Sequence, residues 1–458
     1  MENTSYIKIK TLVENHQQYF HTQETKSLLF RENNLLRLKS VILKYEAEIS
    51  DALYKDLHKS TQEAFLTEIS IVLSEIDYHL KHLYSWAKPK RVKTPMHLLP
   101  SSSSIIHEPL GLALIISPWN YPFQLVINPL IGAISAGCCA IVKPSPYTPN
   151  VAKILEVIIK ESFNEKYISI VQGDREVNTH LLDQKVDVLF FTGSPALGKV
   201  VMSAAAKHLT PVILELGGKS PCIVDKDANI DIAAKRIIWG KCINAGQTCI
   251  APDYVFVHES VKEKLIQKME LFISEMYGDD CQKSEFYPRM VNDNAFERVS
   301  NYLKFGKVRI GGKLDKADKY IEPTVIDEVD MNSELMQDEI FGPILPLIEF
   351  SDIQEPIQYI NTHEKPLAFY YFGTNEEAQK VLASTTSGGA CINDTLMHIA
   401  NHHLPFGGVG NSGLGKYHGN ESFLAFSNRR ATVNTPTWID LPFKYPPFKF
   451  FNLIKKIV

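Results

Sequence analysis

The sequence lacks the cysteine patterns that mark disulfide-rich and zinc-binding proteins. It has 7 cysteines in 458 residues, an odd number, and none of them stands in a Cys-x-x-Cys pair. Disulfide frameworks use even numbers of cysteines, and structural zinc sites use closely spaced cysteine and histidine ligands. We therefore expect no disulfide framework, no bound metal, and a reducing, cytoplasmic environment.

Long apolar runs and an excess of one charge are also missing. The net charge is -4 and the pI is near 6.4, so nothing in the charge favours nucleic acid as a partner. The longest apolar stretches, such as residues 110–117, fall well short of the roughly 20 residues that span a bilayer. Residues 1–26 are polar and do not resemble a targeting segment.

What the chain does contain is a large apolar fraction, 45% of its residues, which is enough for two or three units with cores of their own. Apolar residues recur every three or four positions in 27–57 and 64–87 and predict two long amphipathic helices that act as scaffold. Residues 89–104, rich in lysine, proline and serine, predict a connector that leads into a strand at Ser104.

Strands and helices then alternate, which predicts an α/β fold with a parallel sheet covered by helices on both faces. The predicted strands are 112–116, 139–142, 168–171, 188–191 and 212–214, and the predicted helices are 126–136, 151–160, 176–184 and 196–206. Such sheets bind ligands at the carboxyl ends of their strands. The residues that follow each strand are therefore the candidates for function.

Two of these strand ends carry polar side chains. Asn120 lies in a turn between two prolines and could be a fixed hydrogen-bond donor to an oxyanion, or only an Asx turn. Lys143, followed by proline and serine, could bind a ribose hydroxyl or a phosphate, although most lysines of this kind are simply solvated.

A third strand end combines a glycine turn with a helix start. Gly193 follows the strand, Ser194 is the expected N-cap, and Pro195 is the expected first helical residue. The free amides of such a helix start can receive a pyrophosphate. The spacing between Gly193 and Gly198 departs from the usual dinucleotide fingerprint, so a nucleotide role and a structural role are both open.

Glu215 and Cys249 are the candidates for reactive groups. Glu215 ends a strand beside two glycines and could be a general base, or a buried carboxylate paired with Lys219 or a backbone amide. Cys249 follows the turn-forming residues 244–248 and precedes Pro252, which predicts a presented thiol. The alternative is a cysteine that only packs in the core.

Two later segments suit a nucleotide or a closed pocket. Glu339 could accept hydrogen bonds from two ribose hydroxyls while Phe341 packs on a flat ring. Phe406 is the one large aromatic residue of a glycine-dense loop, 404–413, which implies close backbone approach. We interpret the histidines at 398, 402 and 403 as pocket and turn residues, because no cysteine or carboxylate set completes a metal site.

Together these motifs resemble the aldehyde dehydrogenase superfamily, in the same order and over about residues 1–430. They are the Trp-Asn turn, Lys-Pro-Ser, Phe-Thr-Gly-Ser, Glu-Leu-Gly-Gly-Lys-Ser-Pro, Gly-Gln-x-Cys, Glu-Ile-Phe-Gly-Pro and Pro-Phe-Gly-Gly. The start of the chain near the first long helix, and the segments 204–211, 407–413 and 441–447, are similar to the class 3 branch of fatty and aromatic aldehyde dehydrogenases.

The resemblance implies three parts and a homodimer. Residues 1–88 and 108–214 would form a Rossmann-type cofactor domain, and residues 215–428 an α/β catalytic domain. Residues 89–107 and 429–458 would form a small β oligomerisation arm and the C-terminal tail. For the tail segment 448–458 we expect packing on the protein's own dimer, with weak contact to a membrane surface as the alternative.

The resemblance also implies residue roles and a reaction. The chain would oxidise a medium-chain, long-chain or aromatic aldehyde to the acid through a cysteine thiohemiacetal and a thioester, with hydride transfer to NAD or NADP. Cys249 would be the nucleophile, Glu215 the general base, and Asn120 with the Cys249 backbone amide the oxyanion donors. The implied cofactor-binding residues are Ser117, Trp119, Lys143, Gly193, Ser194, Gly198, Leu216, Gly217, Glu339 and Phe341; the implied substrate pocket is Tyr121, Ile399 and Phe406.

One position departs from the family pattern. Many members have a glutamate after Lys-Pro-Ser, where this chain has Pro146. Without that carboxylate a 2'-phosphate is no longer repelled, so we expect use of NADP alongside NAD or in preference to it. Two rival functions stay open: a dehydrogenase that passes the acyl group to coenzyme A, which usually lacks a residue like Glu215, and a cofactor-independent thiol esterase.

Overall fold

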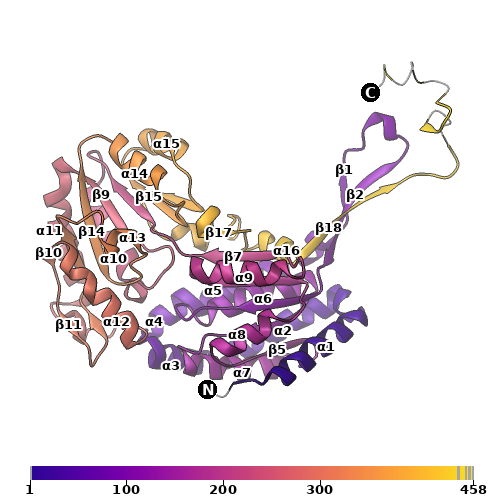
Figure 1. Cartoon of the computed structure of the whole chain (residues 1–458), viewed down its shortest axis with the longest axis horizontal. Coiled ribbons are helices and arrows are strands. Elements are labelled where there is room, and N and C mark those ends of the chain that lie inside the picture. The colour runs from indigo at the N-terminus through magenta and orange to yellow at the C-terminus, as the bar shows by residue number, and fades with distance from the viewer. Residues whose placement is uncertain (1–2, 441–443, 449–450, 452–454, 456–458) are drawn as a thin grey trace.

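The computed structural model describes residues 3–440, 444–448, 451 and 455, which form two lobes and a projecting arm (Figure 1). The first lobe is built on a six-stranded sheet with the order β17-β7-β6-β3-β4-β5. All neighbouring strands are parallel except β17, which is antiparallel to β7. Their bounds are β3 Leu112–Ile116, β4 Cys139–Lys143, β5 Ile168–Ile170, β6 Val188–Gly193, β7 Val212–Leu216 and β17 Gly413–Leu414. The predicted α/β fold is confirmed.

The strand order of this sheet explains where a ligand can enter. The chain runs from β3 outward to β4 and β5, and then crosses back to β6 and β7 on the other side of β3. A crevice opens at such a reversal, outside the carboxyl ends of the strands. Because β3 and β6 are neighbours there, the Trp119–Asn120 turn and the Gly193–Ser194 turn come to the same edge of the sheet.

Helices cover both faces of this sheet. On one face α6 (Gln124–Ala136) and α7 (Pro149–Ser162) contact α2 (Leu28–Lys44), α3 (Glu46–Leu57) and α5 (Ser70–Ala87). On the other face lie α1 (Tyr6–His21), α8 (Arg175–Leu182) and α9 (Pro195–Ala206). Helix α6 is buried along its whole length, which its nearly continuous apolar sequence requires.

The N-terminal helices differ from the prediction in three ways. The first 26 residues include α1, whose narrow buried stripe of Ile9, Leu12, Val13 and His16 is outnumbered by polar residues. The predicted helix 27–57 is two helices, because Tyr45 leaves helical geometry with φ -106° and ψ 19°. The predicted helix 64–87 starts earlier as α4 (Thr61–Ala64) and passes through a π-helical turn, Phe65–Ile69, before α5.

The second lobe is built on a seven-stranded sheet with the order β10-β13-β14-β9-β8-β15-β16. Only β10 runs antiparallel to its neighbour. The strands are β8 Pro221–Val224, β9 Tyr254–His258, β10 Lys307–Ile310, β13 Thr324–Asp327, β14 Ile344–Phe350, β15 Ala368–Phe372 and β16 Gly389–Ile392. The main helices are α10 Ile230–Cys242, α11 Lys262–Tyr277, α12 Asp293–Ser300, α14 Gln354–Thr362 and α15 Asn375–Ser384. A short hairpin is formed by β11 (Leu314–Asp315) and β12 (Tyr320–Ile321).

The arm is a three-stranded antiparallel sheet that extends away from both lobes (Figure 1). It consists of β1 (Lys90–Val92), β2 (Ser102–Pro109) and β18 (Ser427–Asn434), so β2 starts two residues before the predicted Ser104. Just before β18, β17 and α16 (Asn420–Ala425) pack on the first lobe. The domain boundaries expected from the sequence stay a prediction.

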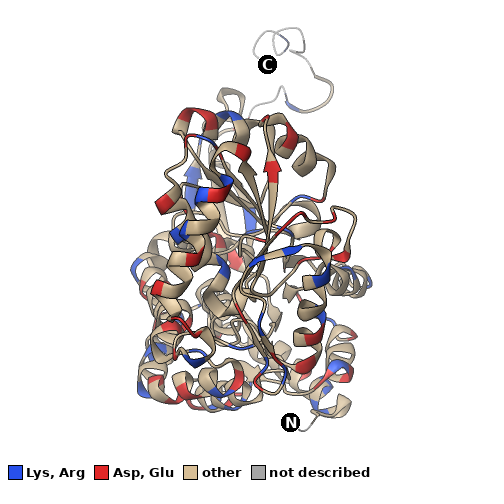
Figure 2. Cartoon of the chain, turned by 90° about the vertical axis from the view of Figure 1, so that its left-hand side faces the viewer, with Lys and Arg blue, Asp and Glu red and all other residues tan. Residues whose placement is uncertain are grey.

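The surface carries both charges without segregation. Acidic and basic residues are interspersed along the helices and strands drawn in Figure 2. Within residues 3–440 and the described part of the tail, no helix combines the length and apolar character needed to cross a bilayer. Of the tail segment 448–458, only Phe448, Phe451 and Lys455 belong to the described residues, so its expected packing stays untested.

Helix α1 offers a matched test of the core of the first lobe. Ile9 is fully buried, whereas Ile7, two residues earlier, is 77% exposed. We expect Ile9→Ala to lower the free energy of unfolding by about 2–5 kcal/mol, because it leaves a cavity. Ile7→Ala should change it by no more than about 0.5 kcal/mol. Urea denaturation of both variants measures this; equal destabilisation would show that α1 does not pack as described.

Candidate active site

A cleft of about 610 Å³ lies where residues from both lobes meet. Ligand pockets commonly have volumes of about 300–1,000 Å³. Nine of the predicted site residues line this cleft: Trp119, Asn120, Gly193, Ser194, Glu215, Gly217, Cys249, Glu339 and Phe341. Ser117, Tyr121, Lys143, Gly198, Leu216, Ile399 and Phe406 are not among its lining residues.

Cys249 reaches the cleft because the chain reverses sharply after α10. Asn244 and Ala245 adopt left-handed conformations with φ of 52° and 51°, which is unusual for residues with a side chain. Gly246 continues with φ 72°, and a Cβ atom there would lie 2.3 Å from the carbonyl oxygen of Gly342. The turn leaves Cys249 half-buried on the wall of the cleft, so the alternative of a core cysteine is wrong.

This turn is held by amide side chains. Asn244 Nδ2 donates to the carbonyl oxygens of Asn120 (2.8 Å) and Gln247 (3.0 Å). Gln247 Nε2 donates to the carbonyl oxygens of Asn244 and Arg289, both at 3.0 Å, and Gln247 Oε1 accepts from the amide of Val291. Left-handed residues of this kind persist only where the surroundings over-determine them. The amide network supplies that restraint.

Asn120 is 3% exposed, and its side-chain amide makes no hydrogen bond to a described residue. An Asx turn would need a nearby amide, but residue 122 is proline and the amide of Phe123 donates to Glu68 instead (2.9 Å). The Asx-turn alternative is therefore wrong. The Asn120 side chain lines the cleft with its donor group available to a ligand.

Glu215 is 1% exposed, and its carboxylate oxygens meet no hydrogen-bond partner of ordinary geometry among the described residues. Burial raises the pKa of this carboxyl to about 8, and the nearby Cys249 thiol offsets part of the rise. Lys219 does not pair with Glu215, because its Nζ donates to Asp253 Oδ1 at 2.5 Å. The paired-carboxylate alternative is therefore wrong for Lys219.

The Cys249 thiol responds to the same surroundings. Burial and the carboxylates of Glu215 and Glu339 raise its pKa well above the ordinary value for cysteine. Cys249 and Glu215 thus lie close enough for each to shift the pKa of the other. A thiol and a potential proton acceptor are adjacent in the cleft.

The loop that carries Glu339 is fixed from two sides. Arg298 donates to the carbonyl oxygens of Glu339 (3.2 Å) and Ile340 (3.0 Å), and Asp253 Oδ2 accepts from the amide of Ile340 (3.0 Å). A Cβ atom at Gly217 would meet the Glu339 carboxylate, so a larger residue there would displace this side chain from its present position. Burial raises the pKa of Glu339 to about 8.

The aromatic residues Phe341 and Trp119 approach each other across this part of the cleft. Their ring centroids are 5.4 Å apart with an interplanar angle of 83°, an edge-to-face arrangement. Phe341 has a left-handed backbone with φ 47°. The rings of Phe341 and Trp119 thus add apolar surface to the cleft that Glu215 and Glu339 also line.

The helix start after β6 has the predicted form. Ser194 is the N-cap of α9, its side chain accepts from the amide of Leu197 at 3.4 Å, and Pro195 is the first helical residue. At Gly198, a Cβ atom would lie 2.7 Å from the side chain of Leu216, so glycine allows α9 to pack closely on β7. The two residues Gly198 and Leu216 therefore pack against each other outside the cleft lining.

Lys143 and Ser117 are buried and do not line the cleft. Lys143 is 1% exposed and its ammonium group makes no hydrogen bond to a described residue, so the solvated-lysine alternative is wrong. Burial lowers its pKa to about 8. The Ser117 hydroxyl donates to the carbonyl oxygen of Leu125 at 2.8 Å. A role of either residue in cofactor binding stays a prediction.

The three predicted pocket residues, Tyr121, Ile399 and Phe406, do not line the cleft and have other contacts. The Tyr121 hydroxyl is 2.6 Å from Thr248 Oγ1, next to Cys249 in the chain. Phe406 stacks on the rings of His398 and His418, with centroid distances of 5.8 and 5.2 Å. Ile399 is half-buried and packs against the core. A substrate pocket formed by these residues stays a prediction.

The remaining histidines of this region have local partners. His402 Nδ1 lies 2.7 Å from Glu75 Oε2, and His403 Nδ1 lies 3.1 Å from the Tyr78 hydroxyl. In the part of the chain that the structure describes, no group of three or more histidine, cysteine, aspartate or glutamate side chains could hold a metal ion.

The sequence analysis missed several residues of the site. Thr192 lines the cleft with a buried hydroxyl that has no hydrogen-bond partner within the described part of the chain, and Asp253 and Arg298 hold the Glu339 loop. Beneath the cleft, Lys59 and Glu68 form an ion pair at 2.7 Å. Thr192 is part of the Phe-Thr-Gly-Ser motif. Asp253, Arg298, Lys59 and Glu68 could not be recognised from the neighbouring sequence, because their partners are distant in the chain.

The chemistry of this cleft fits a nicotinamide dinucleotide. Two carboxyl groups with raised pKa, the buried Glu215 and the half-buried Glu339, line the cleft, and their deprotonated forms would stabilise a cationic ring there. The Thr192 hydroxyl, which has no hydrogen-bond partner among the described residues, offers a donor to a ribose or phosphate oxygen. Gly217 keeps the backbone close to the acidic side chain that would meet a ribose.

Comparison with known proteins identifies the relatives of this chain. It is 47% identical over 434 residues to a 4,4'-diaponeurosporen-aldehyde dehydrogenase of Staphylococcus aureus, covering 94% of this chain and 95% of that protein. It is 43% identical to a dimeric NADP-preferring aldehyde dehydrogenase of Canis lupus familiaris, covering 96% and 98%. A substrate-bound structure of Staphylococcus aureus AldH superposes with a TM-score of 0.96 at 45% identity, covering 98% and 99%.

The family model described as the aldehyde dehydrogenase family matches residues 2–432, which include both lobes, the cleft and most of the described arm. The predicted resemblance is confirmed, and the chain belongs to the aldehyde dehydrogenase family.

Proposed function

We propose that Cys249 carries out, with Asn120 and Glu215, the NAD(P)-dependent oxidation of aldehydes to carboxylic acids that this family catalyses. One observation carries the proposal: the Asn120 amide, the Glu215 carboxyl and the Cys249 thiol line one cleft. In the chain, Asn120 and Glu215 are more than 90 residues apart, and Glu215 and Cys249 more than 30. These are the groups that a covalent route through a thioester needs.

The thiolate of Cys249, formed by loss of the thiol proton to water, would attack the aldehyde carbon, form a C–S bond and move the carbonyl π electrons onto the oxygen as negative charge. The Asn120 amide and the backbone N–H of Cys249 would stabilise this oxyanion. When bound, the nicotinamide ring supplies a hydride acceptor. Loss of hydride from the carbon of the thiohemiacetal leaves a thioester on Cys249.

Glu215 would complete the cycle as the general base. Its unpaired carboxylate can take a proton from water, whose oxygen attacks the thioester carbon and releases the carboxylic acid and the thiolate. The raised pKa of Glu215 makes its deprotonated form a stronger base than an ordinary carboxylate. This base favours hydrolysis over acyl transfer to coenzyme A, and the cofactor cleft disfavours a cofactor-independent esterase.

For the substrate, we infer an apolar aldehyde of medium or long chain, or an aromatic one. The relative from Staphylococcus aureus is named for a diaponeurosporen-aldehyde. In this chain the buried Phe406 and the half-buried Ile399 are apolar, and Tyr121 lies beside Thr248, the neighbour of Cys249 in the chain. These contacts support the assignment of the three residues to the substrate pocket.

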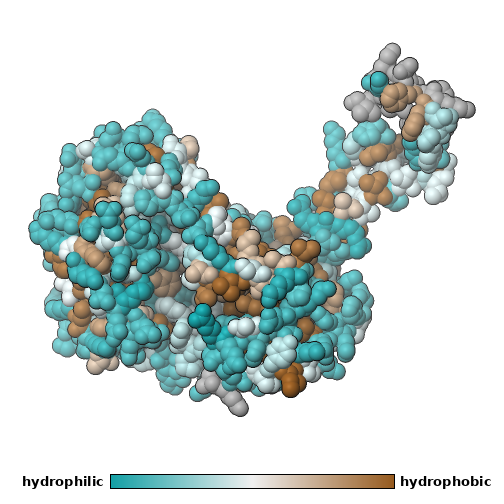
Figure 3. All heavy atoms as spheres, in the orientation of Figure 1, coloured by the Kyte–Doolittle hydropathy of each residue, from teal (hydrophilic) through white to brown (hydrophobic). Residues whose placement is uncertain are grey.

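We also infer a homodimer in which the arm takes part. The arm exposes large apolar side chains, including Met96 (83% exposed) and Trp438 (76%), and hydrophobic atoms are visible along it (Figure 3). A second apolar surface covers the region of α9, where Leu197, Val200 and Met202 are exposed. Apolar surfaces of this kind mark sites of protein association. A relative from dog is named as dimeric.

The proposed division into a cofactor domain, a catalytic domain and an oligomerisation arm follows the three sheets. The first sheet carries Lys143 and Gly193, and the loop between α10 and β9 in the second lobe carries Cys249. Contact of the tail with a membrane surface remains the alternative to packing on the dimer, and a cytoplasmic location is part of the same proposal.

Replacing the nucleophile gives the first test. Cys249→Ala should abolish the formation of reduced cofactor from aldehyde, because the covalent route is lost. Cys391, which is also half-buried, is the matched control, and Cys391→Ala should retain turnover. The absorbance of reduced nicotinamide measures both. Full activity of the Cys249 variant would disprove the assignment.

The pKa of Glu215 predicts a pH dependence for thioester hydrolysis. A base with a pKa of about 8 is mostly protonated at lower pH, so the hydrolysis rate should rise about tenfold per pH unit up to about pH 8 and then level off. Glu215→Gln should slow steady-state turnover by about 100-fold or more yet keep a first burst of reduced cofactor. Stopped-flow absorbance separates the two phases; a variant without the burst would contradict a role confined to hydrolysis.

Pro146 predicts the cofactor preference. Without a carboxylate at this position, kcat/KM with NADP should equal or exceed that with NAD, and Pro146→Glu should shift the preference toward NAD. Initial rates at varied cofactor concentration measure the ratio. A parent enzyme that prefers NAD by about 100-fold or more would refute the role of Pro146.

A further inference from the structure

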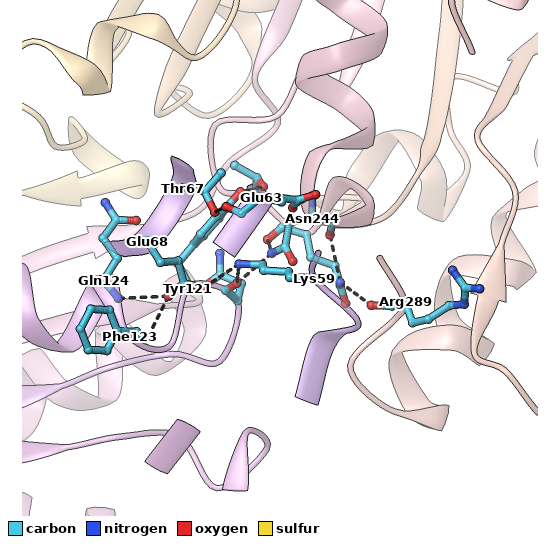
Figure 4. Close-up of polar contacts among 12 residues, drawn as sticks. Lys59, Glu63, Thr67, Glu68, Tyr121, Phe123, Gln124, Asn244 and Arg289 are labelled. Carbon is cyan, nitrogen blue, oxygen red and sulfur yellow. Dashed lines mark hydrogen bonds and ion pairs between the residues drawn. The ribbon is translucent and has the colours of Figure 1, made fainter. Parts of the chain in front are cut away.

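Residues 59–68 of the N-terminal helices contact the two loops that carry Asn120 and Cys249 through the side chains of Lys59, Glu63 and Glu68 (Figure 4). We propose that Lys59 of this segment is a positioning residue: paired with Glu68, it fixes the Asn120 turn so that the Asn120 amide is held at the oxyanion position. The inference rests on the proposed role of Asn120 and adds a residue that touches neither substrate nor cofactor.

The ammonium group of Lys59 has two hydrogen bonds and one cation–π contact, and two of these three interactions are to the Asn120 turn. Its Nζ donates to Glu68 Oε1 at 2.7 Å and to the carbonyl oxygen of Asn120 at 3.2 Å. The same atom lies 4.0 Å from the ring centroid of Tyr121, a cation–π contact. Lys59 is fully buried, so these contacts account for its charge without help from bulk water.

Glu68 holds the other end of the turn. Its second oxygen accepts from the amides of Phe123 (2.9 Å) and Gln124 (3.1 Å), at the start of α6. Helix α6 has no side-chain cap of its own, so Glu68 supplies the acceptor and the negative charge that a helix start favours. Glu68 lies in the π-helical turn 65–69, a distortion that often occurs at functional sites.

A buried ion pair is a poor device for stability alone. The desolvation of two charges can exceed their attraction, and apolar residues of similar volume often serve stability equally well. Here, besides the ion pair itself, the hydrogen bonds of Lys59 and Glu68 go to one short turn, from Asn120 to Gln124. The arrangement therefore specifies the position of that turn, and with it the direction of the Asn120 side chain.

The same segment also reaches the loop of Cys249. Glu63 Oε1 accepts from the amide of Asn244 at 2.8 Å, where the left-handed turn begins. Tyr121, which lies under Lys59, contacts Thr248 through its hydroxyl. The oxyanion donor and the nucleophile are thus held against one common support.

A double-mutant cycle tests the proposal. Lys59→Met should lower kcat/KM for aldehyde by about 10- to 100-fold, because small misplacements of a catalytic group have effects of this size. In the Asn120→Ala background the same substitution should change kcat/KM by less than about twofold, since the group that Lys59 positions is gone. The Kd for the cofactor, measured by fluorescence quenching, should stay within about twofold of the parent.

Two further variants separate positioning from folding. Arg31 is a buried cation that holds the carbonyl oxygen of Ser135 (3.0 Å) at the opposite end of α6, and Arg31→Met should lower stability without changing kcat/KM. If Lys59→Met does not fold, the pair Lys59→Met with Glu68→Gln removes both charges while leaving an acceptor for the helix amides. This double variant should fold and show the same loss of kcat/KM.

The outcomes distinguish the inference from the function on which it rests. An equal loss of kcat/KM from Lys59→Met in both backgrounds, or no loss in the parent, would overturn the role of Lys59. An Asn120→Ala variant with unchanged kcat/KM would instead overturn the proposed role of Asn120 itself.

Discussion

The hydrogen bond from Asn244 Nδ2 to the carbonyl oxygen of Asn120, 2.8 Å long, joins the two lobes at the point where they face the cleft. It connects the turn after β3 to the strained turn before Cys249, whose residues 244 and 245 are both left-handed. Strain of this kind needs support from all sides. Gln247 supports the strained turn from the second lobe, and Glu63 supports it from the first by accepting from the amide of Asn244. Lys59 donates to the same Asn120 carbonyl oxygen that accepts from Asn244. The distance between the proposed nucleophile and oxyanion donor depends on this joint.

The charged side chains of the cleft leave Glu215 without an ion-pair partner in the described part of the chain. Glu215 and Glu339 both line the cleft, and burial raises the pKa of each to about 8. The neighbouring cations are engaged elsewhere: Lys219 contacts Asp253 and two carbonyl oxygens, and Arg298 contacts the backbone of the Glu339 loop. The carboxyl of Glu215 is therefore left without a counter-ion. An unpaired buried acid is unfavourable for folding and suited to proton transfer.

Much of this site could be predicted from the sequence, because its residues follow strands. The ends of β3, β6 and β7 carry Asn120, Gly193 and Glu215, and parallel strands bring their ends to one edge. The supports could not be predicted in this way. Lys59 and Glu68 act across more than 50 residues, and their segment has the ordinary pattern of an amphipathic helix. Helix α1 could not be predicted either, because its four buried residues lie among many polar ones and give only a weak helical periodicity of apolar residues.

The most direct test of the covalent route is mass spectrometry of the Glu215→Gln variant mixed with an aldehyde and NAD or NADP. Hydrolysis should be slow in this variant, so the acyl-enzyme should accumulate. The account predicts a mass increase equal to the acyl group, located on the peptide that contains Cys249. Turnover without any adduct, or an adduct confined to another residue, would contradict it.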